Sequence, residues 1–221
     1  MKIPQLPLEE LELRMTPERL EKLQRVSLER LRHFTVVLED LYDPHNISAV
    51  IRTCEVFGVQ DVHVIEEINP YRINRSILKG AFKWLNIYRY KERARCMKEL
   101  RSAGYQIAVA STNTTNQLSD LDLTRPTAFY MGAELVGNHP ETLAQADIHF
   151  ILPQYGITES LNVSVAAGVL LTRLDEWMER NGGRSRRTLS PEELTALRRE
   201  WYERQIFGLD ARPTVVEIGE E

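Results

Sequence analysis

Short apolar runs alternate with longer segments of helical periodicity along most of the chain. Residues 34–38 read FTVVL, a β-branched run typical of a buried strand, whereas residues 162–180 repeat apolar positions at helical spacing. The pattern predicts strands at residues 34–38, 62–65, 85–90, 107–110, 127–131 and 148–152. It predicts helices at residues 47–57, 92–103, 141–146 and 162–180.

This alternation predicts an α/β fold with a mostly parallel sheet covered by helices on both faces. Ligands of such sheets bind outside the carboxyl ends of the strands. Three loops rich in small and polar residues leave strand ends, at residues 111–113, 132–134 and 153–162. We therefore expect a nucleotide-like ligand there, although many loops after strands have this composition.

Helical extensions flank this body at both ends. Thr16-Pro17 predicts the start of an N-terminal helix, with Thr16 as the cap. Residues 184–187 read as a flexible basic linker, Ser190 opens a capping box before a helix that runs to about residue 206, and residues 215–221 form an acidic tail. The predicted parts are an N-terminal extension, residues 1–33, a body, residues 34–181, and a C-terminal extension, residues 182–221.

Composition narrows the class of protein. A chain of 221 residues suffices for one sizeable domain with appendages, and it has no apolar run long enough for a transmembrane helix. The acidic start argues against a signal peptide, and the cysteines, Cys54 and Cys96, form no CxxC pair, which favours a reducing cytoplasm. No GxGxxG, P-loop or GxSxG motif occurs, and the histidines lack metal-ligand spacing, so no metal is expected.

The distribution of charge suggests a polyanionic partner, although the net charge is −4. Residues 71–101 contain ten Lys or Arg against two acids, a local charge of +8, and they interleave aromatic residues that could stack on RNA bases. A solvated helix face would give a similar run of charge. We expect RNA contacts from Arg72, Arg75, Lys79, Lys83, Arg184, Arg186 and Arg187.

Three segments carry a resemblance to a known family. They are LEDLYDPHNISAVIRTCEVFGVQDVHVI at residues 38–65, FYMGAELVGNHPETLAQADIHFILPQYG at residues 129–156 and ESLNVSVAAGVLLTRL at residues 159–174. Their order and spacing resemble motifs 1, 2 and 3 of the SpoU (TrmH) branch of the SPOUT RNA methyltransferases. The combination of Asn46 with Arg52, Gly132-x-Glu134 and Ser160-Leu161-Asn162 makes the resemblance specific.

The resemblance implies methyl transfer from S-adenosylmethionine (SAM) to a ribose 2′-hydroxyl of RNA, without a metal. It also implies a C-terminal trefoil knot, which holds SAM, and a homodimer with the active site near its interface. The small residues Ser164, Ala166, Ala167 and Gly168 suit a close interface, and they equally suit an ordinary packed core helix.

The catalytic residues that the resemblance implies are Arg52, Asn46, Glu134, Ser160 and Asn162. Each has an ordinary alternative: a surface ion pair for Arg52, a turn contact for Glu134 and helix caps for the other three. Arg52 would act either as an unusual base or by stabilising the developing alkoxide and gripping the adjacent phosphate. Because arginine normally stays protonated, we favour the second role.

The cofactor-binding residues that the resemblance implies come from the three strand-end loops. Backbone groups would hold the adenine and methionine parts, and Ile151 and Leu161 would line the adenine pocket. The expected set is Ser111, Thr112, Gly132, Ile151, Pro153, Ser160 and Leu161.

The helical extensions and residues 76–84 (SILKGAFKW) resemble the branch members that methylate the D-loop guanosine of tRNA, position 18 in tRNA numbering. The expected partner is therefore tRNA, without a membrane. Action on rRNA or another tRNA site, and a catalytically silent RNA-binding protein of the same fold, remain alternatives.

Overall fold

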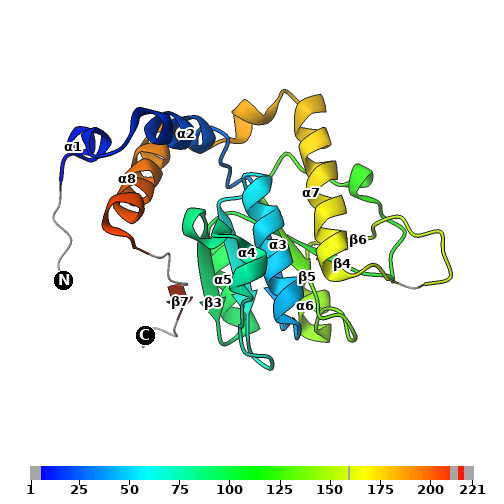
Figure 1. Ribbon diagram of the computed structural model, residues 1–221. Coiled ribbons are helices and arrows are strands. Elements are labelled where there is room, and N and C mark those ends of the chain that lie inside the picture. Colours follow the sequence, from blue (N-terminus) through cyan, green and yellow to red (C-terminus); the bar gives the residue numbers. More distant parts are fainter. Residues whose placement is uncertain (1–5, 159, 210–213, 217–221) are drawn as a thin grey trace.

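The computed structural model describes residues 6–158, 160–209 and 214–216, and it is built around one seven-stranded sheet (Figure 1). The strand order is β6-β4-β5-β1-β2-β3-β7, and every neighbouring pair is parallel. The strands are β1 (Phe34–Glu39), β2 (Asp61–Ile65), β3 (Asn86–Tyr90), β4 (Gln106–Ala110), β5 (Thr127–Met131), β6 (Ile148–Phe150) and β7 (Thr214–Val216). The predicted α/β fold with a parallel sheet is confirmed.

The central strand β1 is buried along its whole length, which explains its continuous β-branched sequence. Two strands differ from the prediction. β6 ends at Phe150 because Ile151 leaves the ladder and forms a bridge with Gln117. β7 adds an unpredicted edge strand beside β3, and two of its three residues belong to the segment predicted to be an acidic tail. Residues 217–221 of that tail lie outside the described residues.

Helices cover both faces of the sheet. On one face, α3 (Pro44–Val56) and α7 (Val163–Arg180) pack over the larger core, and α5 (Arg93–Ser102) and α6 (Pro140–Gln145) cover the other face (Figure 1). Short helical turns connect these elements: α4 (Arg75–Leu78), η1 (Ala81–Trp84) and η2 (Leu118–Asp120). The carboxyl ends of β1 and β5 are neighbours, so the loops after them meet at one edge.

The two extensions pack against each other. α1 (Leu8–Leu13), α2 (Pro17–Ser27) and α8 (Pro191–Phe207) lie side by side and share a core of Leu11, Leu23 and Trp201 (Figure 1). The predicted caps are present, because Thr16 accepts from the backbone of Arg19 and Ser190 forms a capping box with Glu193. The ends of the chain thus form a second helical core beside the sheet.

The predicted flexible linker is instead a short helical turn, η3 (Arg184–Arg187). Arg184 is mostly buried, pairs with Asp175 at 2.7 Å and donates to the carbonyl oxygens of Glu29 and Phe57. Arg187 stacks over Trp177, 4.5 Å from the ring centroid. The described side chains therefore tie this segment to the body.

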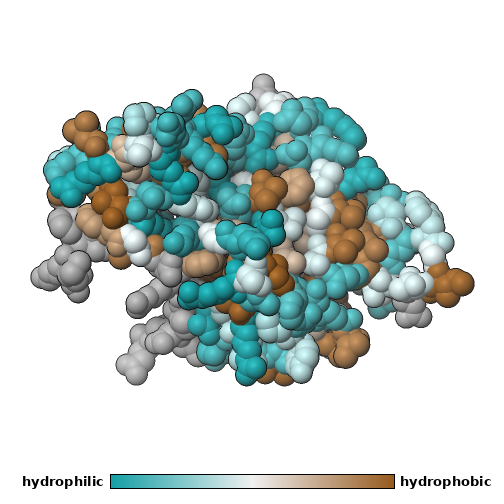
Figure 2. All heavy atoms as spheres, in the orientation of Figure 1, coloured by the Kyte–Doolittle hydropathy of each residue, from teal (hydrophilic) through white to brown (hydrophobic). Residues whose placement is uncertain are grey.

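Exposed apolar side chains gather at the start of α7 and on the turns beside it (Figure 2). Leu135 is 98% exposed and Val165 is 51% exposed, and Val136 and Leu161 are exposed as well. Ala167, by contrast, is buried in the larger core, as expected for an ordinary core helix. We call Leu135, Val136, Leu161 and Val165 the apolar rim.

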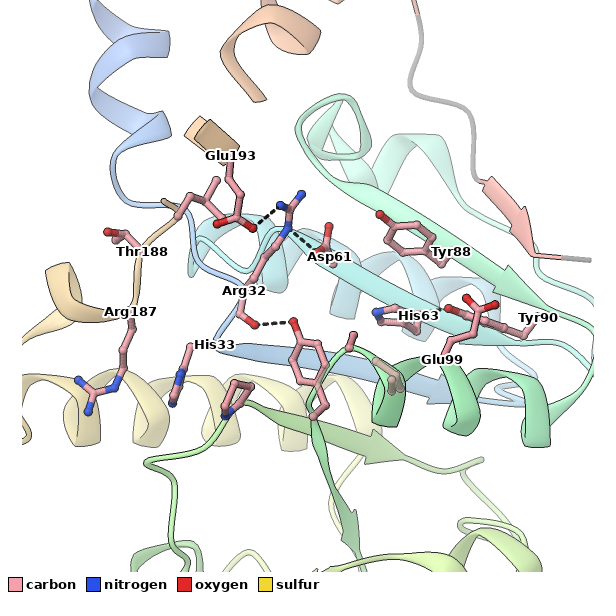
Figure 3. Close-up of a pocket in the computed structure, with 15 residues that line it drawn as sticks. Arg32, His33, Asp61, His63, Tyr88, Tyr90, Glu99, Arg187, Thr188 and Glu193 are labelled. Atoms are coloured by element: carbon pink, nitrogen blue, oxygen red, sulfur yellow. Dashed lines mark hydrogen bonds and ion pairs between the residues drawn. The ribbon is translucent and has the colours of Figure 1, made fainter. Parts of the chain in front are cut away.

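A cavity of about 570 Å³ lies at the opposite, amino edge of the sheet (Figure 3). His63 and Tyr88 of the neighbouring strands β2 and β3 form part of its wall. Residues 187–189, which lead into α8, and Glu193 in the first turn of α8 also line it. It is separate from the loops that the sequence motifs occupy.

Candidate active site

Three polar side chains from the three motif segments form a hydrogen-bonded chain at the carboxyl edge of the sheet. Asn46 donates from Nδ2 to Glu134 Oε1 at 2.6 Å, and Asn162 donates from Nδ2 to Asn46 Oδ1 at 3.0 Å. Both ends of the Asn46 amide are therefore engaged, which fixes its orientation. The structure brings together three of the five predicted catalytic residues.

Asn46 can make these contacts because it does not cap its own helix. The structure starts α3 at Pro44, three residues earlier than predicted, and Asp43 is the cap, accepting from the backbone of His45 at 2.8 Å. Asn46 lies in the first helical turn, where its side chain projects towards the loop after β5. The capping alternative for Asn46 is wrong.

Glu134 is positioned by a tight turn that requires glycine. Ala133 and Gly137 exchange two backbone hydrogen bonds of 3.1 and 2.8 Å across this turn. A Cβ atom at Gly132 would overlap the backbone of Gly137 and Asn138, and Gly137 has a φ of +71°. The Gly132-x-Glu134 motif therefore holds the carboxylate on a rigid turn facing α3.

Asn162 has two roles at the start of α7. Its Oδ1 accepts from the Ser164 backbone at 2.9 Å, which caps the helix, while its Nδ2 binds Asn46. Ser160 and Leu161 precede it and are exposed. Helix capping and the contact with the active-site chain are thus compatible for this residue.

Arg52 lies on α3 but outside this hydrogen-bonded chain. It is exposed, and its one hydrogen bond within the described residues goes from Nη1 to the carbonyl oxygen of Ile77 at 3.3 Å. That bond joins α3 to α4, which carries Arg75. The guanidinium thus lies between the helix of the first motif and the basic segment.

The predicted cofactor loops are adjacent because β6, β4 and β5 are neighbours in the sheet. The Ser111 backbone donates to Phe150 at 2.9 Å, and the Ile151 backbone donates to Asn116 at 2.8 Å, so the loops after β4 and β6 are cross-linked. Thr112 and Pro153 lie exposed on these loops, with Ser111 and Ile151 partly exposed. This edge presents accessible backbone groups and small side chains.

Asn138 is a polar residue of this edge that sequence reasoning missed. It is 6% exposed, and its Nδ2 donates to the carbonyl oxygen of Ala110 at 2.9 Å. Its Oδ1 is buried without a hydrogen-bond partner among the described residues. A buried amide oxygen with no partner is costly, so it is a candidate acceptor for a ligand donor at the ends of β4 and β5. Its place directly after the turn was the signal available in the sequence.

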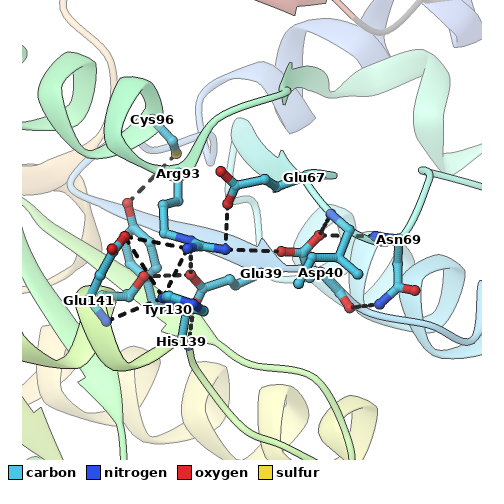
Figure 4. Close-up of polar contacts among 11 residues, drawn as sticks. Glu39, Asp40, Glu67, Asn69, Arg93, Cys96, Tyr130, His139 and Glu141 are labelled. Carbon is cyan, nitrogen blue, oxygen red and sulfur yellow. Dashed lines mark hydrogen bonds and ion pairs between the residues drawn. The ribbon is translucent and has the colours of Figure 1, made fainter.

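An ionic network centred on the mostly buried Arg93 supports the same edge (Figure 4). Arg93 pairs with Glu67, lies 3.6 Å from Glu39 and 3.9 Å from Asp40, and donates to His139 Nδ1 at 2.9 Å. Glu39 accepts from the His139 backbone at 3.1 Å, and burial raises its pKa despite this contact and the nearby guanidinium.

This network joins three segments that the sequence keeps apart. Asp40, which has a left-handed φ of +50°, accepts from the backbone of Ile68 and Asn69, just before the basic segment. Glu39 also accepts from the hydroxyl of Thr142 on α6. The end of β1, the loop just before the basic segment and the helix after the Glu134 turn are therefore held together. Acids directly after an apolar strand were the sequence signal for it.

The predicted RNA-binding residues divide into two groups. Arg72, Arg75 and Lys79 are exposed on or beside α4, and Arg75 lies 5.8 Å from the ring of Phe82. Lys83 is partly buried, Arg184 makes the contacts described above, and Arg187 stacks over Trp177 and donates to the carbonyl oxygen of Asn181 at 3.0 Å. The side chain of Arg186 lies outside the described residues.

Two general properties of the described residues complete the site. Across residues 6–158, 160–209 and 214–216, no three His, Cys, Asp or Glu side chains come together as a candidate metal site. Within the same ranges, the helices are too short or too polar to cross a membrane. Both cysteines are buried and free, and burial raises the pKa of Cys54 to about 12.

The SpoU rRNA Methylase family model matches residues 33–172, which contain the first two motif segments and all but the last two residues of the third. The chain belongs to the SpoU methylase family. This SpoU methylase is 36% identical over 161 residues to the tRNA (guanosine(18)-2'-O)-methyltransferase of Borreliella burgdorferi, covering 72% of this chain and 74% of that protein. The protein of the same name from Aquifex aeolicus is 33% identical over 187 residues, 83% of this chain and 88% of that protein.

Solved structures agree with this assignment. The Aquifex aeolicus TrmH/SpoU tRNA modifying enzyme matches this SpoU methylase with a TM-score of 0.77 and 31% identity, over 86% of this chain and 97% of that chain. The coverage extends beyond the 140 residues of the family model, so it includes part of the helical extensions. The family predicted from the motifs is confirmed.

Proposed function

We propose that this SpoU methylase transfers a methyl group from SAM to the ribose 2′-hydroxyl of a tRNA nucleotide, the D-loop guanosine at position 18. The observation that carries the proposal is the Asn46–Glu134–Asn162 chain, which unites the three motifs at the carboxyl edge of the sheet. The names of the Borreliella and Aquifex relatives support tRNA and this nucleotide as the substrate.

The edge also suits SAM. The loops after β4, β5 and β6 would hold it, and the unpartnered Asn138 Oδ1 is an acceptor suited to an amine or hydroxyl donor of such a ligand. Leu161, exposed before α7, and Ile151 would cover the adenine. Bound SAM would supply a methyl group on a positively charged sulfur, which is already activated for displacement.

The chain's own residues would position the nucleophile. In the reaction a bond forms between the ribose 2′-oxygen and the methyl carbon, the carbon–sulfur bond breaks, and the hydroxyl proton leaves to a base or to solvent. Glu134 and Asn46 would orient the ribose, and Asn162 would keep Asn46 in place. Such positioning supplies much of the rate enhancement in a reaction of this kind.

Arg52 would act on the RNA side of the site. Its place between α3 and α4 suits a guanidinium that grips the adjacent phosphate and stabilises the developing alkoxide. Since the single hydrogen bond to Ile77 is long and exposed, Arg52 can leave it when RNA binds. Arg72, Arg75 and Lys79 continue this positive surface along the backbone of the RNA.

The assembly and cell compartment belong to the same proposal. The apolar rim beside the active site would be covered in a homodimer, since exposed apolar patches mark interaction sites. The C-terminal part of the body would form the trefoil knot of this family, and the buried free cysteines agree with a cytoplasmic protein. The boundaries at residues 33 and 181 stay a prediction.

The test uses SAM labelled in its methyl group, an unmodified tRNA transcript and digestion of the product to find an alkali-resistant dinucleotide. Label at the D-loop guanosine is the expected result. Arg52→Ala should lose methyl transfer while it keeps its melting temperature and SAM binding. Label found on rRNA fragments but not on tRNA would move the substrate, and SAM binding without label on any RNA would favour a silent RNA-binding protein.

A further inference from the structure

The cavity at the amino edge of the sheet is separate from the methyl-transfer site. Its volume of about 570 Å³ lies in the range of small-molecule sites. Asp61 at the start of β2 and His33 just before β1 line it, and it extends to Tyr90 on β3. The Asn46–Glu134–Asn162 chain lies instead in the loops and helix starts that follow the strands, and none of its three residues lines the cavity.

His63 presents an unused hydrogen-bonding atom to this cavity. The side chain is 8% exposed, and Nδ1 lies 3.0 Å from the hydroxyl of Tyr90. Nε2 has no hydrogen-bond partner among the described residues, and His63 is one of the residues that line the cavity. Burial lowers the pKa of His63 to about 3, so the imidazole is neutral at pH 7. An imidazole nitrogen that has no protein partner, on a residue that lines the cavity, suits a ligand with a complementary polar edge.

Two tyrosine rings stack on the imidazole of His63. His63 and Tyr88 are register partners on β2 and β3, and their rings stack with centroids 5.0 Å apart and an angle of 17°. Tyr90 stacks on His63 from the same strand as Tyr88, at 5.7 Å. In the view of Figure 3, these three rings lie on one side of the cavity, and His33 and Arg187 lie on the other. Stacked aromatic walls favour a planar ligand.

The charged side chains around the cavity are already paired. Arg32 binds Asp61 at 2.7 Å and Glu193 at 2.8 Å, and Glu99 binds Arg95 at 2.6 Å. Pairing of these groups disfavours an ionic ligand, because a phosphate or a metal ion would have to displace an existing partner. The residues therefore suit a neutral, planar molecule that stacks and forms hydrogen bonds at its edge.

We propose that this cavity binds a nucleobase, supplied by an unpaired nucleotide of the RNA substrate, with His63 Nε2 at the edge of the base and Tyr88 against its face. Proteins recognise unpaired bases by this combination of aromatic stacking and edge contacts. Arg187 borders the cavity, in the basic segment 184–187. That the base comes from the RNA substrate rests on the proposed function. That the cavity binds a nucleobase does not.

The first experiment tests the chemistry with guanosine and adenosine. The protein carries ¹⁵N-labelled histidine, and the Nε2 resonance of His63 is assigned by its loss in His63→Leu. Either nucleoside should shift this resonance saturably, whereas ribose should not. Tyr88→Leu should abolish the shift, and Tyr88→Phe, which keeps the ring, should retain it. Unchanged melting temperatures of the Tyr88 variants show that each is folded. No shift with either nucleoside overturns the proposal.

The second experiment tests the source by methylation kinetics with the tRNA transcript. Tyr88→Leu should raise KM for tRNA about tenfold, the loss expected for one stacked base, with kcat and KM for SAM unchanged. Tyr88→Phe should behave as the wild type. A nucleoside shift with unchanged KM would overturn RNA as the source and assign the cavity to free nucleosides. If the wild type methylates no RNA, the proposed function fails, while the nucleoside titration still decides the chemistry of the cavity.

Discussion

Asn46 and Glu134 are 88 positions apart in the sequence and form a 2.6 Å hydrogen bond in the structure. The parallel pairing of β1 with β5 explains this proximity, because Leu38 and Met131 are register partners at the ends of these strands. Each residue follows its own strand by a few positions. The contact therefore depends on the sheet order, which places β5 beside β1 although three strands separate them along the chain.

Asn46→Ala should lower the rate of methyl transfer about 10- to 100-fold. The substitution removes a hydrogen bond to a carboxylate, worth about 1.5–3 kcal/mol, and leaves Glu134 and Asn162 without a shared partner. Single-turnover kinetics with saturating SAM and tRNA would measure the effect. Asp43→Ala is the matched control, since it removes the cap of the same helix and should lower stability by about 1 kcal/mol with little change in rate. Equal rates for Asn46→Ala and the wild type would remove Asn46 from the mechanism.

Arg93→Met should destabilise the fold by about 3 kcal/mol at pH 7, because it leaves the buried carboxylates Glu39 and Asp40 without their cation. The pKa of Glu39 is raised in the folded protein, so its contribution to stability is present below the ordinary carboxyl pKa and is lost as the pH rises through the folded value. Removing Arg93 raises this pKa further. The stability lost in Arg93→Met should therefore be smaller near pH 4 than at pH 7. Urea unfolding at the two pH values would measure it.

Glu39→Gln provides the test of that explanation. In the Arg93→Met background it removes one of the unpaired charges, so the double variant should regain part of the stability at pH 7. It should also flatten the dependence of the Arg93→Met effect on pH. If the effects of Glu39→Gln and Arg93→Met on the free energy of unfolding are additive at both pH values, the two side chains are not coupled.

Arg72→Ala and Lys79→Asn should each weaken tRNA binding. Each should also reduce, by about one, the slope of the logarithm of affinity against the logarithm of salt concentration, because one phosphate contact is lost. Asn is chosen for position 79 because Lys79 has a φ of +49°, which asparagine tolerates. Arg180→Ala, at an exposed cation of α7, should leave the slope unchanged. Arg184→Met should instead lower the melting temperature, since Arg184 bonds to the body. If Arg184→Met instead reduced the salt dependence of tRNA binding and kept normal stability, Arg184 would be an RNA contact and not a structural residue.

Leu135→Asp should convert the proposed homodimer to monomer in sedimentation velocity. Leu135 is fully exposed in the single chain and lies on the turn that carries Glu134, so the substitution places a charge in the proposed interface. Leu13→Asp is the control, because Leu13 is 86% exposed on α1, away from the apolar rim. A wild-type protein that sediments as a monomer at micromolar concentration would refute the homodimer.

Sequence patterns predicted the body well because its strands are buried on both faces. Phe34–Glu39 and Thr127–Met131 are mostly apolar, and their assignment needs no knowledge of neighbours. Residues 214–216 pair with β3 although the sequence there continues into acidic residues, so tertiary pairing decides that strand. The start of α3 was misjudged because Asp43-Pro44 is a cap and first-turn pair that lies before the apolar periodicity.

The motif spacing predicted the residues of the active site but not their contacts. Asn46 looked like a helix cap because Asn often has that role, and its partner could be known only from the β1–β5 pairing. Arg93 looked like one cation in a basic run, yet its mostly buried guanidinium lies among acids from three segments. Charge runs report composition along the chain, whereas burial depends on which face of α5 meets the sheet.

The packing of α1 and α2 against α8 also bears on how the protein is made. The ribosome releases the first two helices before the body and α8 after it, on the order of ten seconds later at usual rates of synthesis. Until α8 arrives, Leu11 and Leu23 lack Trp201 as a partner and remain exposed on the nascent chain. A product truncated before α8 would display this apolar surface permanently. The helical core is thus completed only after the body has been synthesised, because it needs side chains from both ends of the given sequence.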